Sequence, residues 1–174
     1  FKGDNLPVER VSWKDCKRFC DKTGFKMLTE AQWEFACRAG STRRYNWGDK
    51  FDINMINSAS YWAKIELATH KEWEEYNFNS KLQQLGVSTT EATLFKSNGF
   101  GLYDMHGNVL EWCSDYYSSY LLDEVVDPIT SNGLNFINRG GSCADIAHNA
   151  RSACRSYSSP DTKGGNVGLR CATQ

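Results

Sequence analysis

Helix signals come early in this chain and strand signals come late, and this order constrains the fold more than any other feature. Two helices are predicted within residues 12–38: Ser12 begins the first, Gly24 ends it, and Thr29 begins the second. The later half carries short apolar runs separated by glycine, which predict strands at residues 109–113, near 136–137 and at 167–171. This order is typical of an α+β domain with much irregular structure.

Length and charge narrow the class of protein. The chain has 174 residues, of which 40% are hydrophobic and 13% aromatic, and this indicates a globular protein with a real core. We therefore expect a single domain over residues 1–174. The formal net charge is −1 and Lys and Arg are spread evenly, which argues against a nucleic-acid partner. No apolar run approaches the roughly 18 residues that a membrane span needs.

The last part of the chain uses a restricted set of residues. Residues 133–173 include one Lys and no Glu, Gln, Met or Trp, whereas residues 1–132 hold 10 Lys, 10 Glu, 3 Gln, 3 Met and 6 Trp. The types that remain are those reachable from an Asn codon when both adenines are replaced by any base. Two explanations stay open: a segment diversified at adenines, which makes 133–174 a candidate variable region, or the Gly- and Ser-rich end of an ordinary domain.

Cysteine is abundant for a chain of this size. No two cysteines form a CxxC pair and the three histidines are scattered, so a tetrahedral zinc site is not expected. Structural disulfides with leftover thiols fit better, and they favour an oxidising compartment. The seven cysteines are Cys16, Cys20, Cys37, Cys113, Cys143, Cys154 and Cys171.

Six short segments combine Gly, Asn and aromatic residues with isolated charges. They are Pro7–Asp15, Leu28–Ala36, Trp47-Gly48, Asn98–Trp112, Arg139–Ser142 and Asn166–Arg170. Their order and spacing resemble those of the formylglycine-generating-enzyme, or sulfatase-modifying-factor, family, a branch of the C-type lectin-like fold. The resemblance covers nearly the whole chain except an insertion at residues 64–97. It also implies that the N-terminal strands of the family lie before Phe1.

The resemblance leaves catalysis to be judged from the site. Generating enzymes of this family bind copper with a closely spaced cysteine pair that follows the Gly-Gly-Ser motif. Here that interval holds Cys143 alone before Cys154, which takes the position of a structural cysteine in the family. A lone thiolate cannot supply a two-thiolate copper site. We therefore expect no enzymatic activity and no required cofactor; the alternative is a formylglycine-generating-type cysteine oxidase or a catalytically inactive relative of it.

A second resemblance fits the restricted tail. Variable proteins of diversity-generating retroelements, notably spirochaete surface proteins, share this fold and have a C-terminal segment that is rewritten at adenines. The blocks Arg139–Ser142, 150–155 and 166–170 look fixed here, and heterogeneous residues fill the gaps. Lys163 departs from the pattern, because Lys cannot arise from an Asn codon with a fixed pyrimidine. The resemblance implies a display scaffold at the cell surface or outside the cell, anchored by a segment outside this sequence. We expect its ligand to be a macromolecule of the protein class.

On this interpretation the diversified residues face solvent on one contiguous surface, while Arg151, Ala153 and Cys154 point inward or hold the sheet. The alternative is that they are ordinary loop residues of a catalytically dead relative. The candidate ligand-binding residues are Cys143, Ala144, Asp145, Ile146, His148, Ser156, Tyr157, Ser158, Asp161, Thr162, Gly164 and Gly165.

Two further expectations come only from the family resemblance. A calcium site would use Asp104, Gly107, Val109 and Glu111, because Ca²⁺ prefers oxygen ligands. The alternative is a turn in which Asp104 accepts backbone N–H bonds and Glu111 pairs with an arginine. Disulfides would join Cys20 to Cys171 and Cys37 to Cys154.

Overall fold

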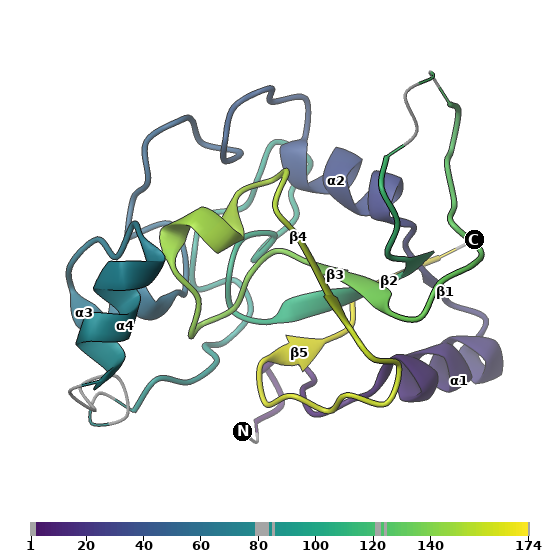
Figure 1. Ribbon diagram of the computed structural model, residues 1–174, viewed down its shortest axis with the longest axis horizontal. Coiled ribbons are helices and arrows are strands. Elements are labelled where there is room, and N and C mark those ends of the chain that lie inside the picture. The colour runs from purple at the N-terminus through teal and green to yellow at the C-terminus, as the bar shows by residue number, and fades with distance from the viewer. Residues whose placement is uncertain (1–2, 79–83, 85, 121–122, 124, 174) are drawn as a thin grey trace.

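Both predicted helices are present. The computed structural model describes residues 3–78, 84, 86–120, 123 and 125–173. Helix α1 spans Trp13–Thr23 and helix α2 spans Glu30–Arg38 (Figure 1). Each begins with a complete capping box, because the side chain of Ser12 or Thr29 and the side chain three residues later each accept a backbone N–H bond. Gly24 ends α1 with φ +79°, as predicted.

Two more helices lie in the middle of the chain. Helix α3 spans Ala59–Ala63 and helix α4 spans His70–Phe78, the second of them within the predicted insertion. Residues 79–83 and 85 of that insertion lie outside the described residues. In the part of the chain that is described, no helix is long and apolar enough to cross a bilayer.

The strands form two small sheets, which confirms the α+β class. In the larger sheet the order is β4-β3-β2-β5, with β5 parallel to β2 and the other pairs antiparallel. The smaller sheet pairs β1 with β6, so the single strand predicted at 167–171 is split between two sheets. The bounds are β1 Lys26–Met27, β2 Leu110–Tyr116, β3 Phe136–Arg139, β4 Arg155–Ser158, β5 Val167–Gly168 and β6 Cys171–Ala172; a 3₁₀ turn, η1, spans Ala147–Ala150.

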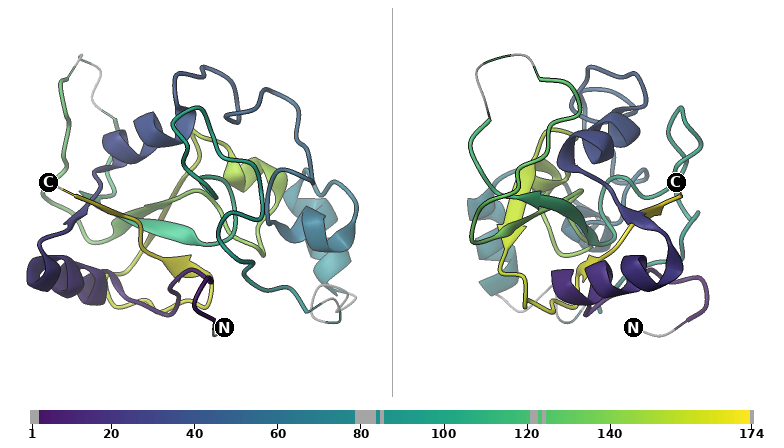
Figure 2. Two further views of the ribbon diagram at one scale, coloured as in Figure 1. Left: turned by 180° about the vertical axis from the view of Figure 1, so that it is seen from behind. Right: turned by 90° about the vertical axis from the view of Figure 1, so that its right-hand side faces the viewer.

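The central strands are buried on both faces. Trp112 and Phe136 pack with the cysteines of α1, whereas the next residues, Cys113 and Ile137, pack with Trp33 of α2. Successive side chains of a strand point to opposite faces, so each strand supplies both clusters. Figure 2 shows α1 and α2 on opposite sides of β2 and β3 accordingly.

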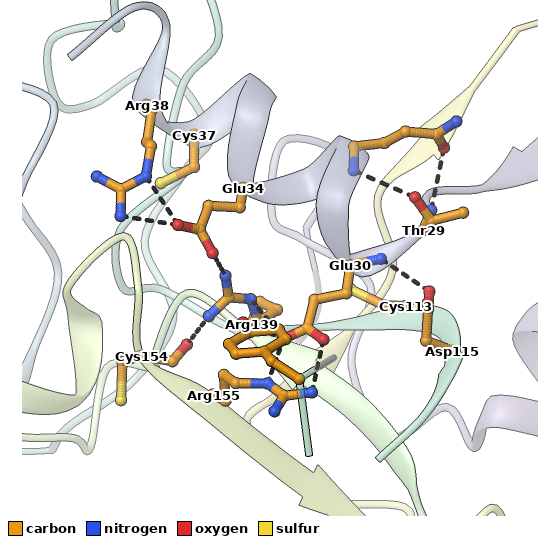
Figure 3. Close-up of polar contacts among 12 residues, drawn as sticks. Thr29, Glu30, Glu34, Cys37, Arg38, Cys113, Asp115, Arg139, Cys154 and Arg155 are labelled. Atoms are coloured by element: carbon orange, nitrogen blue, oxygen red, sulfur yellow. Dashed lines mark hydrogen bonds and ion pairs between the residues drawn. The ribbon is translucent and has the colours of Figure 1, made fainter. Parts of the chain in front are cut away.

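A buried ion-pair network joins α2 to the sheet. Arg139 of β3 has no exposed side-chain surface, pairs with Glu34, and lies 3.5 Å from Glu30 (Figure 3). Arg155 of β4 forms two bonds to Glu30, at 2.7 and 2.8 Å. Arg139 also donates to the carbonyl of Cys154. The network therefore fixes β3, β4 and the residue before β4 against one helix.

A second network joins β2 to the end of the chain. Glu111 accepts bonds from Arg170 at 2.7 and 2.8 Å and from the Trp33 indole at 2.7 Å. All three residues belong to the motifs on which the family resemblance depends. These motifs therefore supply buried polar contacts between the helices and the sheets. We call the helices α1 and α2, the two sheets and these contacts the frame.

All seven cysteines are thiols in this structure, so neither predicted disulfide is formed. Burial, followed by the influence of the Cys20 thiol, raises the pKa of Cys171 to about 11, and oxidation of this pair stays a prediction. Cys37 instead donates to the Met105 carbonyl at 3.6 Å, and burial raises the pKa of its thiol to about 12. The structure thus gives Cys37 a partner other than Cys154.

We predict that substitutions at the two buried tryptophans destabilise the frame for different reasons. Trp112→Ala removes a large core side chain and should cost about 3–5 kcal/mol of unfolding free energy. Trp33→Phe removes the indole bond to the Glu111 carboxylate, which keeps its bonds from Arg170, and should cost about 1.5–3 kcal/mol. Phe35→Ala, on the exposed side of α2, is the control and should stay within about 0.5 kcal/mol of the parent. Denaturant melts that give similar losses for Phe35→Ala and Trp112→Ala would contradict this core.

Candidate binding surface at the C-terminal segment

The first candidate segment precedes β4, and the second begins within it. Residues 143–148 lead from the Gly-Gly-Ser turn into η1, beside α3 and α4 (Figure 1). Residues 156–165 start within β4 and continue in the loop that runs past α1 to β5 (Figure 1). Asp145 and Ser156 line one small cavity, but the burial of Cys143 and Ile146 interrupts the expected contiguous exposed surface.

The first segment is largely buried, so our prediction that it faces solvent is wrong. Cys143 is 3% exposed and Ile146 is 5% exposed. Ile146 packs with Ala59 and Leu67, which come from α3 and the start of the predicted insertion. The apolar side chains of this region cover the loop, and of the five candidates here only His148 is exposed.

Backbone bonds hold the same loop under the insertion. The Trp73 indole donates to the Ala144 carbonyl at 3.0 Å, and the Ala59 N–H donates to the Asp145 carbonyl at 3.0 Å. The Asp145 carboxylate accepts a bond from the Ser142 hydroxyl at 2.6 Å. Ala144 and Asp145 are therefore half-buried parts of the loop, and Asp145 serves an internal turn.

His148 is exposed but already has a partner. Arg151 contacts its Nε2 at 2.7 Å and its carbonyl at 2.9 Å. Burial, followed by the positive charges of Arg151 and Arg44, lowers the pKa of His148. The imidazole is therefore neutral at neutral pH and offers a polar, uncharged contact.

The fixed-looking block 150–155 is tied down mainly through its backbone. The Ala150 carbonyl contacts His106 Nδ1 at 2.7 Å, and the Ser152 N–H donates to the Arg44 carbonyl at 2.8 Å. Arg151 and Cys154 are half-buried, whereas Ala153 is exposed, which corrects the expectation that it points inward. These backbone hydrogen bonds position residues 150–155 although the side chain of Ala153 is exposed to solvent.

The second segment reaches solvent. Tyr157 is 52% exposed, and its ring lies 4.4 Å from the ring of Tyr117. Ser156 and Ser158 on either side are half-buried, and the Ser158 hydroxyl accepts a bond from Asn138 at 3.1 Å. Tyr157 therefore has the position of an aromatic anchor that the sequence suggested for it.

The loop after β4 rests on α1 through two exposed ion pairs. Lys14 lies 2.7 Å from Asp161, and Lys163 lies 2.7 Å from Asp15. Lys163 and Ser12 hold the pKa of Asp15 well below its usual range. Lys163, which departs from the diversified pattern, is thus a contact to the helix cap. The other candidates of this loop, Thr162, Gly164 and Gly165, are half-buried.

Residues 143–165 contain two thiols, those of Cys143 and Cys154. A cavity of about 120 Å³ lies between the first segment and β4, and Cys154 is the thiol in its lining. Burial, with a smaller effect of Asp145, raises the pKa of Cys143 to about 12. Burial also raises the pKa of Cys154. Both thiols are protonated at neutral pH, and the thiolate is the form that attacks or ligates.

The residues of the expected calcium site do not fit a cation. Both carboxylate oxygens of Glu111 accept bonds from Arg170, whose guanidinium supplies the positive charge. Burial raises the pKa of Asp104 to about 6, and its Oδ2 is buried without a hydrogen-bond partner. Among the described residues no group of three or more His, Cys, Asp or Glu is placed to hold a metal. The arrangement matches the alternative, a turn at Asp104 with Glu111 paired to an arginine.

Comparison with known families agrees with this frame. The model of the sulfatase-modifying factor enzyme 1-like domain matches residues 2–174. The chain belongs to this family. The match includes the buried networks of Arg139 and Glu111, so family membership and fold rest on the same residues.

Its relatives include proteins named as enzymes and a protein named as inactive. The formylglycine-generating enzyme of Streptomyces coelicolor is 35% identical over 97% of this chain and 52% of its own length. The inactive C-alpha-formylglycine-generating enzyme 2 of Bos taurus is 33% identical over 97% of this chain and 50% of its own length. The chain therefore spans about half the length of these relatives.

Solved structures share the fold. Treponema denticola variable protein 1 superposes with a TM-score of 0.72 and 22% identity, covering 96% of this chain and 70% of that protein. PvdO from Pseudomonas aeruginosa gives a TM-score of 0.72 and 23% identity, covering 98% of this chain and 63% of that protein. The C-type lectin-like architecture of this family is thereby confirmed for the chain.

Sequence reasoning missed the aromatic residues that adjoin the second segment. Tyr117 and Tyr120, just after β2, are 41% and 61% exposed, and Arg155 stacks on Tyr120 at 4.0 Å. The signal was present in the run Asp115–Tyr120, which is rich in Tyr and Ser. These residue types dominate the contact surfaces of antibodies, because tyrosine offers large area at low entropic cost.

We predict that Asp104 makes the stability of the protein depend on pH. Burial raises the pKa of this carboxyl to about 6 from 3.8, so the folded state holds more protons than the unfolded state between these values. Stability should therefore fall as the pH rises from about 4 to about 6. Asp104→Asn keeps a residue that tolerates the φ of +54° and should flatten this part of the curve. Thermal melts against pH check this, with exposed Asp4→Asn as control; equal curves for parent and Asp104→Asn would contradict it.

Proposed function

We propose that this protein is a non-catalytic binding scaffold that displays part of its C-terminal segment to protein ligands. The carrying observation is that the heterogeneous residues at 156–165 lie exposed or half-exposed on β4 and the following loop. The fixed-looking residues around them hold the frame. None of the side chains at 156–165 belongs to the described core clusters. Side chains outside the core can be exchanged at small cost in stability.

The thiol chemistry supports a binding role over a catalytic one. Cys143 is buried and protonated, and no second thiol accompanies Cys154 in the lining of the neighbouring cavity. The bovine relative named as inactive supports loss of catalysis within this family. The name of the Treponema protein supports variation on this fold.

The restricted residue set supports a genetic source for that variation. A retroelement that rewrites adenines would produce the types found at residues 133–173 and would exclude the five scarce ones. Ligand binding by such a protein implies display at the cell surface or outside the cell, with an anchor outside this sequence. We expect variation to concentrate on the codons of exposed residues, because Cys143 is buried and Ile146 packs with Leu67 of the predicted insertion.

Sequencing the 3′ end of the gene in many cells of one population tests the display function. We expect differences at adenine-templated codons of 156–165 and at His148, and constancy at 150–155 and 166–170. A nearby imperfect repeat that differs from the gene only at adenines should accompany a reverse transcriptase gene. A uniform 3′ sequence without such a repeat would contradict the proposal.

The competing function is a formylglycine-generating cysteine oxidase, favoured by 35% identity to the Streptomyces enzyme. We predict no conversion of a peptide with a CxPxR motif in the presence of Cu(I) and oxygen, because the thiolate pair is missing. Peptide mass before and after incubation measures this. The matched control is Cys143→Ser. Faster conversion of the peptide by the parent protein than by this variant would contradict the non-catalytic proposal and support the oxidase.

A further inference from the structure

Strand β4 has a free edge. It is the terminal strand of the order β4-β3-β2-β5, and in the described part of the chain it pairs only with β3. The right view of Figure 2 shows it along the outer side of the sheet. Natural edge strands are protected by lysines, prolines, bulges or covering segments. The stretch Ser156-Tyr157-Ser158 is regular and carries no charge or proline.

The direction of the backbone groups follows from the neighbouring bonds. The Tyr117 N–H donates to the Asn135 carbonyl at 2.8 Å, so Asn135 faces β2. Backbone groups of successive residues in a strand alternate in direction, so Phe136 and Asn138 face β4. Their register partners are Ser158 and Ser156, which therefore face β3. The N–H and carbonyl of Tyr157, between these two, point outward.

A groove adjoins this edge on the side of α2. It has a volume of about 780 Å³ and lies between α2, Arg155 and the residues 118–120 and 125–130. Its large apolar side chains are open to solvent: Phe35 is 69%, Val126 93% and Ile129 60% exposed. Exposed apolar side chains gathered in one place mark an interaction site.

Three charged residues that line the groove, Arg155, Glu30 and Asp115, are already paired. Arg155 forms a bidentate pair with Glu30 and stacks between Tyr120 at 4.0 Å and Tyr117 at 4.9 Å. The Asp115 carboxylate accepts the N–H of Glu30 at 2.8 Å. The groove therefore offers a ligand mainly apolar contacts. The edge of β4 offers backbone groups that can form hydrogen bonds.

We propose that the ligand is an extended peptide segment of another protein, which adds to the outer edge of β4 as a further strand and places an apolar side chain in the groove. This inference rests on the proposed display function. Arg155 and Tyr157 share the α2 face with their partners Arg139 and Ile137. Side chains of an added strand beside them point to the same face, toward the groove.

Strand addition also explains how a changing surface keeps affinity for polypeptides. Main-chain bonds do not depend on the side chains of either strand, whereas the pockets beside them set specificity. Diversification of Ser156, Tyr157 and Ser158 would thus alter which peptide is preferred and leave the backbone edge intact.

The probe is a set of linear peptides selected from a random library on the immobilised protein. Each is made again with N-methyl groups on alternate residues, in both registers. Methylation in the register that faces β4 should weaken binding by about tenfold or more, and methylation in the other register should have little effect. Selection that yields no binder, or equal effects in both registers, would overturn the proposal.

Paired variants locate the bound edge. Tyr157→Ala removes the side chain, whereas Tyr157→Pro removes both the side chain and the outward N–H. Peptide affinity about tenfold lower in the proline variant than in the alanine variant would report the backbone hydrogen bond. Edge strands tolerate proline where the N–H faces solvent, and a thermal melt checks the fold of the variant. If this variant unfolds, protection of the Tyr157 amide from hydrogen exchange by bound peptide decides instead.

A groove substitution and the oligomeric state complete the test. Val126→Asp should weaken the selected peptides about tenfold, and Leu94→Asp, on an exposed apolar residue outside the groove lining, is the charge-matched control. Self-association that Tyr157→Pro abolishes would assign the edge to a second copy of the chain and overturn the inference. Gene variation without strand addition would retain the display function and reject this binding mode alone.

Discussion

The rest of the structure depends on the fully buried guanidinium of Arg139, which lies between Glu30 and Glu34 of α2 (Figure 3). Removing one partner from such a buried pair leaves an unpaired charge in the interior, at a cost of about 3–5 kcal/mol. Because Arg139 also binds the Cys154 carbonyl, the same group orients β3, α2 and the entry to β4. The Glu-x-x-x-Glu of the helix and the Arg-Gly-Gly-Ser turn are therefore parts of one interaction.

A frame fixed in this way does not require particular side chains on the outer part of the tail. The chain reaches β4 through backbone anchors at Ala150, Ser152 and Cys154, and leaves it toward Arg170, whose partner Glu111 is buried in β2. Exposed residues between these anchors can change without disturbing either network. The proposed binding at the edge strand and its groove therefore requires no change in either network.

The insertion changes which part of the tail can serve that role. In the sequence, residues 143–148 and 156–165 look equally free, with similar small and polar types. In the structure, Leu67 and Trp73 enclose the first segment, and the second follows an open strand edge. Adding a segment to one side of the fold therefore moves the accessible surface toward β4 and α2.

The sequence by itself determined the two helices, their caps and the motifs of the frame, because a capping box joins residues three positions apart. It also determined the family and showed that no closely spaced second cysteine accompanies Cys143. Only the tertiary structure decided that β4 is a strand, that Ile146 is buried and that a groove opens beside Arg155. The physical reason is distance along the chain: the bond from Trp73 to Ala144 joins residues 71 positions apart, and the pairing of β4 depends on β3. Such contacts leave no local pattern, since a short serine-rich strand and an exposed loop have the same composition.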